Sequence, residues 1–140
     1  NVNQKYEWLP SKLDFSMDIA QQSISLESSE KFSILRVDYI RLIEGVRKFI
    51  QSRINPKDDF DNPNIATTFE FVPLELGFVF TCLDGDVDEG LEGRISIRLL
   101  VNLEIVEAQY SSIYIGGEFE VSSSDLLEFL CDLELELGSL

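Results

Sequence analysis

The densest group of oxygen ligands in the chain is the run Asp84-Gly85-Asp86-Val87-Asp88-Glu89-Gly90. Carboxylates at alternate positions are typical of the start of a calcium-binding loop, where they surround the ion. The later positions do not fit, because Glu89 replaces the glycine of the sharp turn and Ile95 replaces the bidentate glutamate. A second cluster, Asp58, Asp59 and Asp61, has weaker spacing. We interpret the first run as an acidic hairpin loop and predict no metal.

Catalytic residue types are scarce. The sequence contains no histidine, so it lacks the commonest general base, the commonest metal ligand and every Ser-His or Cys-His nucleophile. It also contains no glycine-rich phosphate loop, no CxxC pair and no nucleophile elbow. A carboxylate pair for glycoside hydrolysis remains open, although nothing in the sequence selects two particular acids. We therefore predict a protein without enzymatic activity and without a cofactor.

The two cysteines, Cys82 and Cys131, each lie within an apolar pattern. This placement favours two small buried side chains over a disulfide or a metal pair, and it fits a reducing compartment. Residues 1–12 have no basic patch followed by an apolar run, and no segment approaches the eighteen apolar residues that a membrane span requires. We expect a cytoplasmic protein.

Charge is the most informative property. The chain has 26 acidic and 11 basic residues, for a net charge of −15. Residues 1–53 are nearly neutral, with eight basic and seven acidic side chains, whereas residues 54–140 have three basic and nineteen acidic ones. Binding to phosphate backbones or anionic membranes needs Lys and Arg, so both are disfavoured for the second part. A basic protein partner is favoured, because concentrated charge steers an oppositely charged molecule.

The first half has a strand pattern followed by a helix pattern. Apolar residues alternate in residues 13–19, and further strands are expected at 23–27 and 32–37. Asp38 is predicted to cap a helix over residues 39–53, which has apolar side chains at three- and four-residue spacing. The basic residues of this helix are expected to form a solvated face; they are Arg41, Arg47, Lys48 and Arg53.

The second half predicts more strands and a closing helix. A turn-rich loop at 55–64 is followed by a strand with Phe69 and Phe71 that Pro73 breaks. Strands at 74–83, 95–105 and 113–121 follow, with the acidic loop 84–93 after the first and a bulge or close approach at Gly116-Gly117 in the last. Ser122 to Asp125 caps a helix over 125–137, where Asp125 to Glu128 resembles a capping box.

These elements predict one α+β domain over residues 1–140. Consecutive strands with short connections favour an antiparallel meander of about six to seven strands, with two main helices, at about 39–53 and 125–137, packed on it. A chain of 140 residues is long enough to bury a core without disulfides.

Residues 67–137 resemble the immunity proteins of bacterial contact-dependent growth inhibition and wall-associated polymorphic toxin systems. The likeness lies in a Phe/Leu-rich strand pair (TFEFVPLELGFVF), an acidic turn, the long strand GRISIRLLVNLEI, and a strand that leads into a serine-capped leucine helix (EFEVSSSDLLEFLCDL). The resemblance implies a cytoplasmic antitoxin that binds one cognate toxin domain, often a nuclease with a basic cleft, and blocks it without chemistry. No contact position carries over by motif, because such residues differ between members.

Together, charge and resemblance predict a non-enzymatic immunity protein that neutralises a basic toxin domain through an acidic surface. The expected partner-binding residues are the acids of the 84–92 loop and of the C-terminal strand and helix: Asp84, Asp86, Asp88, Glu89, Glu92, Glu118, Glu120, Asp125, Glu128 and Asp132, with Glu134 and Glu136 beyond them. The alternative is a general protein-interaction or structural module that uses an apolar surface or a sheet edge.

Overall fold

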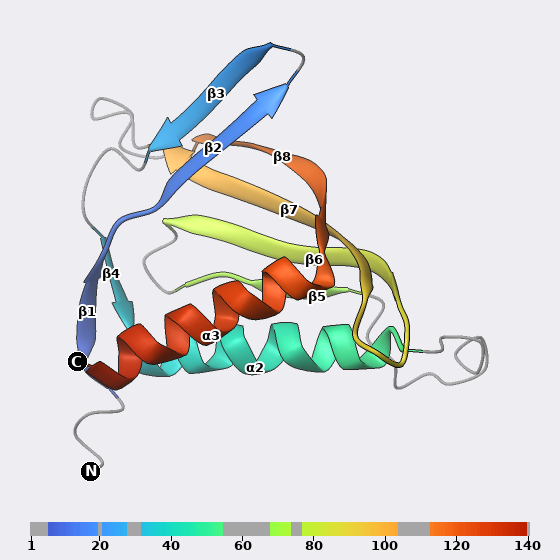
Figure 1. Ribbon diagram of the computed structural model, residues 1–140. Helices are drawn as coiled ribbons and strands as arrows, with labels where there is room; N and C mark the ends of the chain where they lie inside the picture. Colours follow the sequence, from blue (N-terminus) through green and yellow to red (C-terminus); the bar gives the residue numbers. More distant parts are fainter. Residues whose placement is uncertain are drawn as a thin grey trace.

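The computed structural model describes residues 6–19, 21–27, 32–54, 68–73, 77–103 and 113–139, and a four-stranded antiparallel sheet forms most of the second half (Figure 1). Its strands are β5 (Phe69–Phe71), β6 (Phe78–Val87), β7 (Gly93–Leu103) and β8 (Ile113–Ser122). They lie in sequence order, which confirms the α+β class and the antiparallel meander. The alternation that predicted β7 reflects a strand with one apolar face, since Ile95, Ile97 and Val101 are buried.

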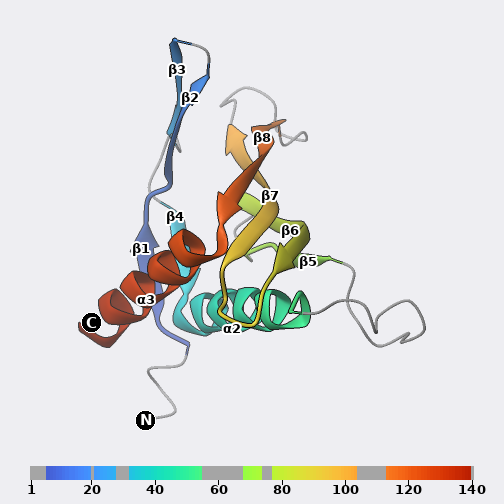
Figure 2. The same ribbon diagram turned by 45° about the vertical axis from the view of Figure 1, so that its right-hand side comes forward.

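The strands of the first half form two further pairs. β1 (Trp8–Ser11) pairs with β4 (Phe32–Leu35), and β2 (Asp14–Ile19) pairs with β3 (Gln22–Glu27), both antiparallel. The described strands are therefore distributed over three sheets, and the β2–β3 hairpin extends away from both helices (Figures 1 and 2). The predicted loop 55–64 with Asp58, Asp59 and Asp61, residues 74–76 and residues 104–105 lie outside the described residues.

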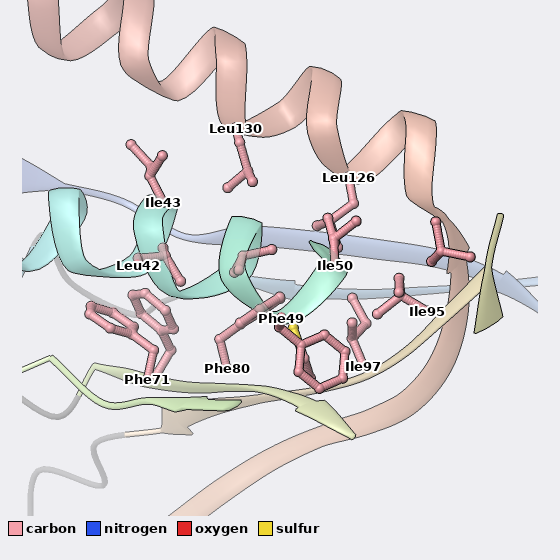
Figure 3. Packing of buried hydrophobic residues seen from close by; sticks show 14 of the residues in the cluster. Leu42, Ile43, Phe49, Ile50, Phe71, Phe80, Ile95, Ile97, Leu126 and Leu130 are labelled. Carbon is pink, nitrogen blue, oxygen red and sulfur yellow. The ribbon is translucent and has the colours of Figure 1, made fainter. Parts of the chain in front are cut away.

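Two helices cover the apolar face of the four-stranded sheet. α2 (Arg36–Ser52) packs against β5 and β6, α3 (Ser123–Ser139) packs against β7 and β8, and the helices touch each other. Leu42 and Phe49 of α2 lie on the side of the helix that faces Phe71 and Phe80 of the sheet, and Ile43 lies on the side that faces α3. Leu126 and Leu130 of α3 close the core from that side (Figure 3). Burial of such side chains supplies most of the free energy of folding, at about 1.5–3 kcal/mol for each large one.

The start of α2 differs from the prediction. The helix begins at Arg36, so β4 ends at Leu35 and Asp38 lies in the first turn, not at the N-cap. A side-chain cap is dispensable because the N–H of Arg36 donates to the carbonyl of Glu7 in a bond of 2.9 Å that continues the β1–β4 pairing. Asp38 is buried and accepts a bond of 2.8 Å from the guanidinium of Arg41, and a carboxylate suits the positive end of the helix.

The closing helix begins within the predicted capping segment. The side-chain oxygen of Ser122 accepts a bond of 3.0 Å from the N–H of Asp125, so Ser122 is the cap and the predicted Asp125 to Glu128 box is displaced into the helix. Leu126 and Leu130 of this helix are buried, whereas 53% of the surface of Phe129 is exposed.

The two glycines of β8 differ sharply in their surroundings. A β-carbon added to Gly116 would lie 1.8 Å from the carbonyl oxygen of Leu99, whereas one added to Gly117 would meet nothing within 4 Å. The predicted close approach is therefore confirmed at Gly116, where the backbones of β7 and β8 meet. β7 and β8 pair without a register shift, so the feature is not a bulge.

This difference gives a matched pair of substitutions. Gly116→Ala should lower the free energy of unfolding by about 1–3 kcal/mol, because backbone atoms of β7 must move to admit the methyl group. Gly117→Ala should leave stability unchanged or raise it slightly, since alanine restricts the unfolded chain. Urea denaturation of the two variants beside the wild type measures both effects. Equal midpoints for Gly116→Ala and Gly117→Ala would show that the strands do not approach closely there.

Candidate functional site

The tip of the β6–β7 hairpin is organised by one carboxylate. Asp88 accepts bonds from the N–H groups of Gly90 (2.8 Å) and Glu92 (3.0 Å), and its own N–H donates to the carbonyl of Glu92 (2.9 Å). Leu91 has a φ of 65°, which the tight turn requires. Asp88 thus maintains the turn, while Glu89 and Glu92 are exposed at the tip.

Asp84 and Asp86 lie on a strand, and the prediction of a loop from residue 84 is wrong. β6 continues to Val87, whose N–H donates to the carbonyl of Arg53 at 3.4 Å and whose side chain is buried. Alternate acids are the solvent-facing positions of such a strand, so the spacing that resembles a calcium loop has a different cause. Among the described residues, no three His, Cys, Asp or Glu side chains come together in a way that could hold a metal ion.

Arginines lie beside several of the predicted partner-binding acids. Arg98 of β7 donates two hydrogen bonds to Glu118 of β8, one of them 2.8 Å long, and Arg94 lies 3.5 Å from Glu120. Arg98 and Glu118 lie directly opposite each other on β7 and β8, whereas Arg94 and Glu120 are diagonal neighbours on the same two strands. Each exposed pair contributes only about 0.2–1 kcal/mol, so both can exchange partners at small cost.

The basic face predicted for α2 is only partly solvated. Arg41 and Lys48 are exposed, but the side chain of Arg53 is 12% exposed, stacks on the ring of Phe49 at 4.7 Å and lies 3.8 Å from Asp84. Arg47 crosses to α3 and binds both carboxylate oxygens of Glu134, at 2.5 and 2.7 Å. This pairing lowers the pKa of Glu134 and raises that of Arg47. Arg47 and Arg53 therefore join elements of the fold.

The acids of α3 follow one side of the helix. Asp125, Glu128 and Asp132 are exposed and separated by three and four residues, so they lie on neighbouring turns. No ion pair involves them within the described part of the chain. They differ in this from Glu134, which belongs to the contact with α2.

Ser123 joins the hairpin tip to this row of acids. Its side chain is completely buried, and its hydroxyl lies 2.6 Å from the carbonyl oxygen of Leu91 and 3.3 Å from that of Gly93. The tip therefore lies against the first turn of α3. We call the resulting set the acidic edge: Glu89, Glu92, Asp125, Glu128 and Asp132.

The structure thus divides the predicted partner-binding residues into two kinds. Five of them form the acidic edge, and Asp86 is exposed beside it on β6, opposite Arg94. The others have a role within the fold: Asp88 in the turn, and Asp84, Glu118 and Glu120 beside arginines. Sequence reasoning did not find the linking residue Ser123, since its partners lie 30 and 32 positions away.

No protein-family model matches the chain, and neither curated proteins nor solved structures show significant similarity to it. Within the described ranges, neither helix combines the length and apolarity needed to cross a membrane.

Removal of the Ser123 hydroxyl tests the connection between tip and helix. Ser123→Ala should lower the free energy of unfolding by about 0.5–1.5 kcal/mol, because the carbonyl oxygens of Leu91 and Gly93 lose a donor. Amide hydrogen exchange at residues 88–92 should accelerate. Ser124→Ala is the control, since Ser124 is exposed and its side chain lies 3.1 Å from that of Ser122, far from the carbonyls that Ser123 bonds. Unchanged exchange at the tip in Ser123→Ala would contradict the proposed link.

The cysteines behave differently from each other. Cys82 is completely buried, as predicted, and burial raises its pKa from 9.0 to about 12. Cys131 was also expected to be buried, but it is exposed on α3, because it follows Leu130 on the solvent side of the helix. Both are free thiols.

This contrast predicts selective thiol chemistry. At about pH 8 a disulfide reagent should modify Cys131 quickly and Cys82 only after unfolding, because the thiolate is the reactive form. Since the pKa of Cys82 is raised in the folded state, the stability that it contributes is fully present below pH 9.0 and declines as the pH rises toward 12. The loss of stability between about pH 9 and 11 should therefore be smaller in Cys82→Ala than in the wild type and should persist in Cys131→Ala.

Proposed function

We propose that the chain is a non-enzymatic binding protein whose acidic edge engages a basic protein partner, and that the partner is a toxin domain that it neutralises. The observation that carries the proposal is the juxtaposition at Ser123, which places acids of the hairpin tip next to acids of α3. Cytoplasmic location and a nuclease as the target follow from the resemblance to immunity proteins.

The pairing of cations supports this assignment. Seven of the eight described Lys and Arg residues have a carboxylate within 4.0 Å, and none of these carboxylates belongs to Glu92, Asp125, Glu128 or Asp132. Close charge pairs across the interface of a nuclease with its protein inhibitor have coupling energies of about 1.5–7 kcal/mol. An edge of this kind can therefore supply both fast association and affinity.

The alternative function, binding through an apolar surface, also has a specific observation in its favour. Several large apolar side chains are exposed, among them Ile115 at 45%, Phe129 at 53% and Leu135 at 72%. A partner that used these alone would bind with little dependence on salt, whereas one that used the acidic edge would be released as salt rises.

Two charge-reversal variants separate these possibilities. The edge variant is Glu92→Lys with Glu128→Lys; the matched control is Glu44→Lys with Glu70→Lys, which makes the same charge change at exposed positions on α2 and β5. The partner is the basic protein that the wild-type chain captures from its source cells at low salt, and the product of the neighbouring reading frame is the first candidate. The edge variant should bind it at least about tenfold more weakly, a loss of about 1.4 kcal/mol, and the control within about threefold of wild type.

Titration calorimetry at about 50 mM and about 0.5 M salt measures both affinities. Equal binding by the edge variant and the control would overturn the acidic edge as the interface. Neutralisation is tested with the same pair of proteins: an equimolar amount of the wild-type chain should abolish the partner's toxic activity, and the edge variant should not.

A further inference from the structure

An open apolar groove lies between α3 and the four-stranded sheet. It has a volume of about 500 Å³, within the range of about 300–1,000 Å³ that is usual for ligand sites. Leu99, Phe119 and Val121 of the sheet form part of its floor and are only partly buried, and Phe129 and Leu133 of α3 form one wall. The helix diverges from β7 and β8 as it runs from Ser123 toward its C-terminus (Figures 1 and 2).

The rim of the groove is acidic. Asp125 and Glu136 lie on the α3 side, and Asp14 lies on the opposite side with Lys12, 3.5 Å from it. The rim thus contains three carboxylates and one ammonium group, and the interior of the groove is apolar. Tyr39 also lines the groove; burial raises its pKa, the hydrogen bond with Ser11 opposes this, and the charge of Glu136 adds to the increase. Glu136 is therefore close enough to the groove to act on a bound group.

We propose that this groove receives a short amphipathic segment of the basic partner, with bulky apolar side chains inside and Lys or Arg at the rim. The proposal rests on the proposed function and adds a second part to its interface. Charge complementarity selects the occupant, since an anionic amphiphile would meet the carboxylates of the rim. Asp125 belongs to both the rim and the acidic edge, so one continuous segment can contact both.

Phe129 is the side chain on which this recognition depends most. It lines the groove yet is 53% exposed, so a bound apolar group would cover it and remove its surface from water. Leu135, on the same helix, is 72% exposed and does not line the groove, which makes it a matched control. Neither side chain belongs to the buried core cluster, so truncation of either leaves the fold intact.

Three synthetic peptides serve as probes, independently of the natural partner. The first repeats Lys-Leu-Phe, the second has Ser in place of Leu and Phe, and the third has Glu in place of Lys. Only the first should bind well, at least about tenfold more tightly than either of the others. It should shift the methyl and aromatic NMR signals of Leu99, Phe119 and Phe129. Phe129→Ser should weaken it at least about tenfold, and Leu135→Ser should not.

Each outcome decides one of the two proposals. If the first two peptides bind equally and Phe129→Ser has no effect, the groove is not a docking site, and the acidic edge still stands or falls by the Glu92 and Glu128 reversals. If the first and third peptides bind equally, the groove takes apolar segments without regard to charge, and the basic character of its occupant is wrong. Tight binding of the first peptide that is lost only in Phe129→Ser supports the groove as proposed.

Discussion

The direct passage from β8 into α3 is the constraint on which the rest of the arrangement depends. β8 ends at Ser122 and the helix begins at Ser123, so no linker can adjust where the helix starts. Its first turn is held by the bonds of Ser123 to the hairpin, and its last turns by Arg47 on Glu134 and by Arg36 on the carbonyl oxygen of Leu137 at 2.6 Å. Because both ends of α3 are tied to different elements, it crosses the sheet obliquely. This crossing leaves the groove open between α3 and the sheet and keeps the row of acids on α3 at the surface.

The periodicity of apolar residues predicted the class of the fold and most of its elements, because such a pattern depends only on which face of a local segment is buried. It could not predict where β6 ends, since Asp84 and Asp86 alternate with Gly85 and Val87 as readily in a strand as in a loop. The start of α2 depends on a distant partner, the carbonyl of Glu7. The start of α3 depends on which of several neighbouring residues is the cap, and that residue is Ser122. The exposure of Phe129 and Cys131 depends on which side of α3 packs against α2 and the sheet, which is a tertiary property.

The sequence predicted how many acidic residues the surface has in excess, but not where on the structure they gather. Composition predicted a surplus of carboxylates, and the resemblance to immunity proteins suggested a use for them. Which acids serve the fold could be found only from contacts between segments far apart in sequence, such as Arg53 with Asp84 and Arg47 with Glu134. Many carboxylates have no such contact, because the chain has few cations. Among them are Asp125, Glu128 and Asp132, the acids of α3 that begin beside the hairpin tip.

Nearly all described cations are paired with a carboxylate at 4.0 Å or less, and this has opposite consequences for the stability of the fold and for the affinity for a partner when the salt concentration changes. Mutual repulsion within a chain of charge −15 acts over longer distances than these pairs, and at physiological ionic strength a Debye length of about 8 Å suppresses the long-range term more than the short one. High salt therefore weakens the internal repulsion and raises the stability of the folded chain, while it lowers the affinity of a complex held by charge. At low salt the folded chain is less stable and the affinity is higher, so a bound basic partner neutralises part of the repulsion within this domain.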